Sequence, residues 1–232
     1  MGKIRLDKFI SSQTSCTRSE ATSMIKSGRI SINNQVTRDG SLKIDTDKDC
    51  ISIDGQSISF EEHVYFLLNK PAGVVSATED NLHKTVCDLI DCDREIFPVG
   101  RLDIDTEGLL LLTDDGELAH TLLSPKKHVD KTYYAKLDKD IDSSIYDELV
   151  QKFETGFDYG EEKPSLPSVL EIISPNEIRL TLHEGKFHQV KRMFSVNGYE
   201  VTYLKRISMG KLFLDETLAP GEYKKIFKED IL

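Results

Sequence analysis

The stretch that decides the fold is GRLDIDTEG at Gly100–Gly108, which is followed by four leucines and then by TDDG at 113–116. Charged residues therefore lie directly before an apolar segment that we expect to form a buried strand. A loop that enters a buried strand holds a carboxylate in a partly desolvated cleft, where orientation and pKa are under the control of the protein. The alternative is an exposed turn with solvated acids, and composition alone favours neither reading.

Outward from this stretch, alternating and β-branched segments predict a mainly antiparallel sheet with attached helices, which is an α+β fold. The expected strands are 64–68, 109–113, 133–137, 169–173, 178–182, 201–207 and 211–214. The expected helices are 117–123, 145–153 and 188–196.

The first sixty residues predict a separate small module. A short helical pattern begins at Arg5–Ile10, and the sequence TRSE from Thr17 to Glu20 is a capping box that starts a second helix. Ala21, Met24 and Ile25 are expected on the buried side of that helix, which should end at Gly28. Strands are expected at 29–32 and 50–53, with turns at 33–34 and 54–55.

Charge is distributed unevenly along the chain. The formal net charge is -10, but residues 1–43 contain eight Lys or Arg against three Asp or Glu, a net charge of +5. Such asymmetry indicates a nucleic-acid-binding arm or domain, because polyanion binding rests on Lys and Arg. We therefore place a domain boundary near residue 61 and predict domains at 1–60 and 61–232.

Composition argues against several other classes of protein. No apolar run approaches the roughly 18 residues that a membrane span needs, and we expect a cytoplasmic protein with no membrane partner. The four cysteines form no CxxC pair, which argues against a zinc ribbon or a disulfide framework. No glycine-rich phosphate loop or metal-ligand cluster is evident, so we expect neither a nucleotide cofactor nor a metal.

The segment 100–108 resembles the signature of the RsuA-type pseudouridine synthases, the small-subunit ribosomal RNA branch of that superfamily. Similar motifs follow in the right order: LNKPAG at 68–73, KTY at 131–133 and EGKFHQVKRM at 184–193. The N-terminal module resembles the S-four-type RNA-binding domain of this family. The resemblance covers nearly the whole chain and implies that domain followed by a mixed, mainly antiparallel-sheet catalytic domain.

The resemblance also implies site residues. Asp103 matches the catalytic aspartate, Tyr133 matches the tyrosine that packs against the target base, and Lys191 matches the basic partner of the carboxylate. A cation near Asp103 would keep it ionised. Without the resemblance, Tyr133 would be read as a core residue. Asp105 would be read as half of a metal-binding pair only if further ligands accompanied it.

Basic residues beyond this set are predicted to bind RNA. Arg101 could support the loop, the flipped nucleotide or a phosphate, and His188 could instead be structural. Lys70–Gly73 is read as a turn first and an RNA contact second. The predicted RNA-binding residues are Arg5, Lys8, Arg18, Lys26, Arg29, Arg101, Lys131, His188 and Arg192.

The implied activity is the cofactor-independent isomerisation of one uridine in ribosomal RNA, with uridine 516 of 16S RNA in conventional numbering as the expected target. Asp103 either removes a sugar proton to give a glycal or attacks the sugar covalently. The alternatives are a synthase for large-subunit RNA and a non-catalytic RNA-binding protein of ribosome assembly. The expected partner is ribosomal RNA or a small-subunit assembly intermediate, and the expected state is a monomer.

Overall fold

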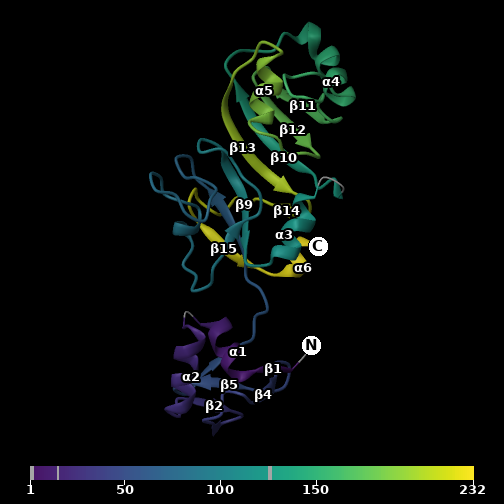
Figure 1. Ribbon diagram of the computed structural model, residues 1–232. Helices are drawn as coiled ribbons and strands as arrows, with labels where there is room; N and C mark the ends of the chain where they lie inside the picture. The colour runs from purple at the N-terminus through teal and green to yellow at the C-terminus, as the bar shows by residue number, and fades with distance from the viewer. Residues whose placement is uncertain (1–2, 15, 125–126) are drawn as a thin grey trace. The chain divides into compact units, whose positions relative to one another are not determined.

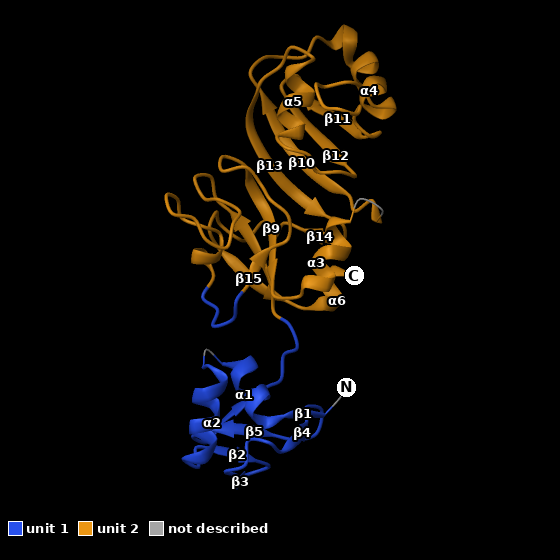
Figure 2. Ribbon diagram, in the orientation of Figure 1, with its two compact units in different colours: residues 1–63, 91–95 blue, residues 64–90, 96–232 orange. Residues whose placement is uncertain are grey.

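A computed structural model describes residues 3–14, 16–124 and 127–232, and the chain divides into two compact units (Figures 1 and 2). Unit 1 comprises residues 1–63 and 91–95, and unit 2 comprises residues 64–90 and 96–232. The segment 91–95 thus joins unit 1 although the sequence pattern placed it in the catalytic domain. Within the described ranges, no helix is long and apolar enough to cross a membrane.

Unit 1 consists of two helices and two small antiparallel sheets. Its elements are β1 (Lys3–Arg5), α1 (Leu6–Gln13), α2 (Arg18–Lys26), β2 (Ile30–Ile32), β3 (Gln35–Val36), β4 (Lys43–Asp45), β5 (Ile51–Ile53) and β6 (Gln56–Ile58). β1 pairs with β4, and the other sheet has the order β3-β2-β5-β6.

The predicted boundaries of α2 are confirmed. The backbone N–H of Glu20 donates to Thr17 Oγ1 at 3.3 Å, and the Thr17 N–H donates to Glu20 Oε2 at 2.7 Å, which completes the capping box. Gly28, with φ +80°, terminates the helix in the left-handed region. The helices pack their apolar sides on the strands, and the fully buried core residues are Leu6, Phe9, Ile10, Ala21, Ile25, Ile30, Ile44 and Ile51.

Unit 2 is built on one nine-stranded sheet. Its central path has the order β11-β12-β10-β13-β9-β7-β15, with β14 paired to β13 and β8 paired to β9. The strands are β7 (Tyr65–Lys70), β8 (Phe97–Pro98), β9 (Glu107–Thr113), β10 (Lys131–Leu137), β11 (Val169–Ser174), β12 (Glu177–Leu182), β13 (Val201–Met209), β14 (Leu212–Phe213) and β15 (Tyr223–Ile226). The helices are α3 (Gly116–Leu123), α4 (Tyr146–Thr155), α5 (Gln189–Ser195) and α6 (Lys228–Ile231).

The sheet of unit 2 has two antiparallel halves that meet at β9 and β13. Those two strands run parallel and pair only at Glu107–Lys205 and Gly108–Arg206. One half packs against α3 and α6, and the other packs against α4 and α5 (Figure 1). The predicted antiparallel sheet with attached helices is confirmed, and the short parallel contact between its halves carries the decisive loop.

Candidate active site

Gly108 explains why the decisive segment ends in glycine. A Cβ atom at this position would lie 2.3 Å from the backbone oxygen of Arg206, so a side chain cannot fit where β9 meets β13. The residue also has φ +100°, a conformation that glycine adopts without steric cost. Immediately before it, the Thr106 N–H donates to the Asp103 carbonyl at 3.1 Å and closes a turn. Asp103 therefore lies in a loop fixed to the junction of the two half-sheets.

Lys70, at the end of β7, holds this loop through hydrogen bonds to its backbone. Its side chain is fully buried, and its ammonium donates to the carbonyls of Thr106 at 2.8 Å, Pro71 at 3.0 Å and Ile104 at 3.3 Å. The Gly73 N–H donates to the Ile104 carbonyl at 2.7 Å. The Lys70–Gly73 segment is thus a turn, as expected, and its lysine holds the loop.

Burial favours the neutral form of Lys70, and it lowers the pKa of this lysine from 10.5 to about 8. The negative charges of Asp105, Asp103 and Glu107 oppose that effect. The turn at Lys70–Gly73 is predictable from its proline and glycine, whereas the burial of its lysine under the influence of three carboxylates is not.

Ser76 supplies a second anchor. Its hydroxyl donates to the Leu102 carbonyl at 2.9 Å and accepts from the Leu102 N–H at 3.0 Å. Leu102 itself is buried, whereas Arg101 is exposed. The apolar Leu102 side chain and the paired backbone on either side of Asp103 limit the positions that its carboxylate can take.

The carboxylate of Asp103 faces two basic side chains from the chain around α5. Lys191 Nζ lies 3.4 Å from Oδ2, and His188 Nε2 lies 3.5 Å from Oδ1. The Asp103 side chain is 24% exposed, so it is reachable from solvent while partly desolvated. An oriented carboxylate beside the Lys191 ammonium and the His188 ring is suited to nucleophilic or general-base chemistry.

Asp105 is the stronger partner of Lys191. The ammonium donates to its two oxygens at 2.6 and 2.8 Å, which is closer than to Asp103. Burial raises the pKa of Asp105, but the hydrogen bond and positive charge of Lys191 outweigh it and hold the pKa below its ordinary value. The predicted pairing of Lys191 with Asp103 thus exists as a contact, and Asp105 positions the lysine.

Tyr133 lies on β10 in the same row of the sheet as the loop. It pairs with Arg206 of β13, and Arg206 pairs in turn with Gly108 of β9. Its ring is 8% exposed, in the buried face of the strand. The register thus places Tyr133 level with the end of the loop, with β13 between β10 and β9.

Two residues that are predicted to bind RNA, Lys131 and Arg192, make contacts within the protein. Lys131 is only 9% exposed, and its ammonium donates to the Val129 carbonyl at 3.1 Å. Arg192 forms an ion pair with Glu161 and donates to the Gly160 carbonyl at 2.6 Å. Both side chains thus have partners within the protein, and their contact with RNA stays a prediction.

Several predicted RNA contacts of unit 1 are also ion-paired. Arg5 and Arg18 both contact the buried carboxylate of Asp7, at 2.7 and 3.3 Å. The hydrogen bonds from Arg5 are the main cause of the lowered pKa of Asp7, which is about 2. Arg29 pairs with Asp54 at 2.6 Å.

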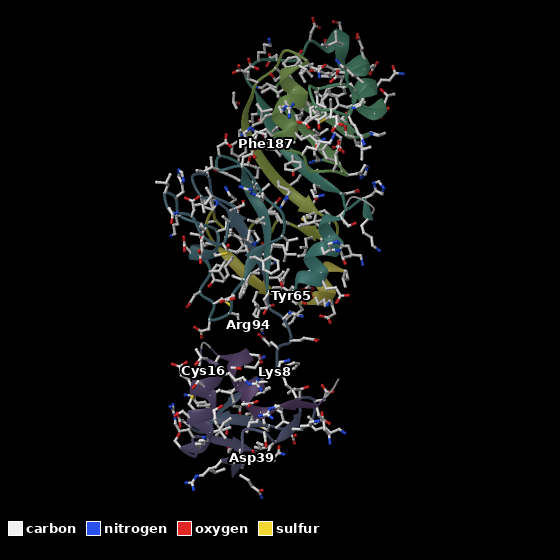
Figure 3. The ribbon with its side chains drawn as sticks, viewed as in Figure 1. Lys8, Cys16, Asp39, Tyr65, Arg94 and Phe187 are labelled. Carbon is white, nitrogen blue, oxygen red and sulfur yellow. The ribbon has the colours of Figure 1, made fainter. Side chains whose placement is uncertain are left out.

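The remaining predicted contacts of unit 1, Lys8 and Lys26, are exposed. A hollow of about 480 Å³ in this unit is lined by Lys3, Ile4, Arg5, Lys8, Thr46, Phe60 and Glu62, and Lys8 is labelled in Figure 3. In the parts of the chain that the structure covers, no group of three or more His, Cys, Asp or Glu could hold a metal ion.

The comparison with known families agrees with this architecture. Residues 64–196 match the model of RNA pseudouridylate synthases, and residues 4–49 match the S4 domain. The first match covers more than half of the chain, so the fold and site define a pseudouridine synthase that carries an N-terminal S4 domain. A crystal structure described as a pseudouridylate synthase superposes with a TM-score of 0.68 at 38% identity and covers 98% of each chain.

Similar sequences narrow the class. The chain is 40% identical over 231 residues to ribosomal small subunit pseudouridine synthase A of Vibrio cholerae, with 98% of each sequence covered. It is 40% identical over 233 residues to the protein of the same name in Escherichia coli K12, again with 98% of each covered. An uncharacterized RNA pseudouridine synthase of Bacillus subtilis, YtzG, is 43% identical over 98% of this chain and 97% of its own length. The chain belongs to the ribosomal small-subunit pseudouridine synthase family.

Proposed function

We propose that this protein converts one uridine of small-subunit ribosomal RNA, uridine 516 of 16S RNA in conventional numbering, into pseudouridine. The observation that carries the proposal is the half-buried carboxylate of Asp103, fixed on an anchored loop and faced by Lys191 and His188. The names of relatives at 40% identity support the choice of a small-subunit rather than a large-subunit substrate.

The reaction is an isomerisation that consumes no other reagent. The target uridine leaves its stack, the C1′–N1 bond breaks, the uracil turns, and a C1′–C5 bond forms. The proton on C5 is then lost, and N1 gains a proton. Burial and hydrogen-bonding groups around the flipped base compensate for the lost stacking. Tyr133 is the proposed ring against which the uracil packs.

Asp103 acts in the proposed mechanism by one of two routes. As a base, it removes the C2′ proton while the C1′–N1 bond breaks, which gives a glycal and the uracil anion. C5 then attacks C1′ of the glycal, and the protonated Asp103 returns the proton to C2′. As a nucleophile, it attacks C1′ and displaces uracil, and the ester bond breaks when C5 attacks the same carbon. Deuterium at C2′ of the target distinguishes the routes, because only the glycal route breaks the C2′–H bond and shows a primary isotope effect.

The proposed mechanism requires neither metal nor nucleotide. Chelator-treated, dialysed protein is therefore expected to release the C5 hydrogen from labelled uridine in small-subunit RNA at the same rate as untreated protein. A strict need for a restored metal would contradict this part of the proposal. Because the proposed substrate is ribosomal RNA, we also propose that the enzyme acts in the cytoplasm, and its action as a monomer stays a prediction.

Mapping pseudouridine in ribosomal RNA from cells with and without this protein tests the target. The expected result is the loss of one site in small-subunit RNA. Loss of a large-subunit site would favour the large-subunit alternative, and an unchanged map would favour a non-catalytic role in ribosome assembly. Comparison of naked RNA with assembly particles in vitro then identifies the form of the substrate.

A further inference from the structure

Phe187 is an exposed aromatic residue beside the candidate active site. It immediately precedes His188, and its side chain is 73% exposed (Figure 3). Leaving a phenyl ring in water forgoes the favourable burial of its apolar surface. Single exposed apolar residues are common, so exposure alone carries no argument.

The ring of Phe187 is held in a defined stack. It lies on the His188 ring with centroids 3.8 Å apart and an interplanar angle of 17°. His188 adopts left-handed backbone angles, φ 48° and ψ 32°, which are uncommon for residues other than glycine. The far edge of this imidazole, Nε2, lies 3.5 Å from Asp103 Oδ1. Within this pair of rings, His188 is therefore next to the Asp103 carboxylate and Phe187 is exposed to solvent.

The position of the Phe187–His188 stack beside Asp103 indicates which part of the RNA would contact it. If Asp103 acts on the ribose of a flipped uridine, the RNA chain on either side must pass within about one nucleotide of His188. Successive bases along a strand are spaced by about 3.4 Å, which is close to the spacing of the two protein rings. Removal of the uridine from its stack leaves a neighbouring base with one face uncovered.

We infer that Phe187 and His188 form a platform on which the nucleobase next to the target uridine stacks while the uridine is flipped into the site. This inference rests on the proposed function and extends it to a second binding position. Aromatic side chains accept any base in this way, because every base presents a π-face. The phenyl ring replaces the contact that the departing uridine gave up and so stabilises the flipped state.

The absence of tryptophan from the chain allows a direct test. Phe187→Trp introduces a single indole at the platform, and Phe227→Trp introduces one at the 65% exposed Phe227, which precedes α6 in the other half of the unit. Each is placed in an Asp103→Asn background, so that a naked RNA oligonucleotide carrying the target uridine binds without turnover. The emission of the Phe187→Trp protein should be quenched saturably, and that of the Phe227→Trp protein should not change.

Kinetics of Phe187→Ala in the otherwise unaltered enzyme provide the second readout. The variant should raise KM by about tenfold with kcat within about threefold of wild type, and Phe187→Trp should retain wild-type kinetics. A lowered kcat at unchanged KM would indicate a structural effect on Asp103 and overturn the platform. So would indole emission that stays unquenched by both saturating RNA and a small-subunit assembly particle. Failure of the proposed function is separate, because the unaltered enzyme would then form pseudouridine neither in this oligonucleotide nor in a small-subunit assembly particle.

Discussion

Lys191 Nζ lies 3.4 Å from Oδ2 of Asp103, although one residue belongs to α5 and the other to the loop before β9. The same ammonium donates to both oxygens of Asp105, at 2.6 and 2.8 Å. One cation thus serves two carboxylates, and the more exposed of them holds it in place. We therefore expect loss of the Asp103 charge and loss of the Asp105 charge to have different effects on turnover.

Asp103→Asn removes the negative charge and the nucleophilic oxygen while keeping the size of the side chain. We expect turnover to fall by roughly 10³-fold or more, with little change in RNA affinity, because the carboxylate acts mainly in the transition state. Release of the C5 hydrogen under single-turnover conditions measures the rate, and filter binding measures the affinity. Wild-type turnover in this variant would remove Asp103 from the mechanism.

Asp105→Asn is the matched control, two residues along the same loop. It weakens the hold on Lys191 but leaves the ammonium next to Asp103, so its effect on turnover should be far smaller, on the order of tenfold. Equal losses in the two variants would point to collapse of the loop or to a shared metal site. Circular dichroism and a metal titration distinguish those two explanations.

Lys191→Met removes the cation that both carboxylates share. We expect turnover to fall by about 10²-fold, because preorganised charge near a reacting group is worth that much in comparable sites. Lys191→Arg keeps the charge, although its planar guanidinium differs in shape from the compact ammonium, and should recover part of the rate. If the arginine variant is no better than the methionine variant, the charge of Lys191 is not what the reaction uses.

Lys70→Met tests the buried anchor of the loop through pH dependence. The pKa of Lys70 is about 8 in the folded protein and 10.5 in the unfolded chain, so between these values the unfolded state binds the extra proton. The free energy of unfolding of wild type relative to the variant should therefore increase as the pH rises from 8 to 10.5. The expected increase is on the order of 3 kcal/mol. Urea denaturation of both proteins at several pH values measures it.

A flat difference between the two proteins over that pH range would show that Lys70 titrates normally. Lys70→Met should also lower activity at pH 7, because three loop carbonyls lose their donor. Lys84→Met, a change on the exposed surface of the same unit, is the control for removal of a lysine and should alter neither quantity.

The elements that can be predicted from the sequence are those whose signals come from residues close together in the chain. The capping box from Thr17 to Glu20 and the left-handed Gly28 involve neighbouring residues only, and α2 has the expected ends. β9 follows from its run of four leucines, and β10 and β12 follow from alternating buried and exposed positions. The short strands β1 and β4 each place one isoleucine between two charged residues, and three positions are too few for a periodic pattern to predict them.

The contacts of the site depend on the tertiary fold. The partners of Lys70 are backbone carbonyls, which leave no mark in the sequence. Asp103 and Asp105 are two residues apart, and only the approach of α5 decides which of them holds Lys191 more closely. The ion pair of Arg192 with Glu161 likewise joins segments that are distant in sequence.

Exposed and buried lysines should differ in their effect on RNA binding. Lys8→Ala and Lys26→Ala, on the exposed surface of unit 1, should each weaken binding and lower the slope of log K against log salt by about one. Lys131→Met, at a buried position, should leave that slope unchanged. Filter binding from 50 to 200 mM salt gives the slopes. A reduced slope for the Lys131 variant would show that Lys131 contacts a phosphate.

Removal of residues 1–60 tests whether this segment binds RNA while the rest of the chain carries the catalytic activity. The apolar core around β7, β9, α3 and α6 includes no residue before Tyr65, so the truncated chain should retain a cooperative thermal transition. The deletion keeps the carbonyls of Glu61 and Glu62, to which Arg94 donates at 2.8 Å.

Because the net positive segment is gone, RNA affinity should fall by about tenfold or more, and the salt dependence of binding should become shallower. Single-turnover rates at saturating RNA should change much less than affinity, since Asp103, Lys191 and Lys70 all remain. If the truncated protein binds and modifies its RNA as well as the full chain does, then residues 1–60 are not the RNA-binding domain, and the positive charge of that segment serves another purpose.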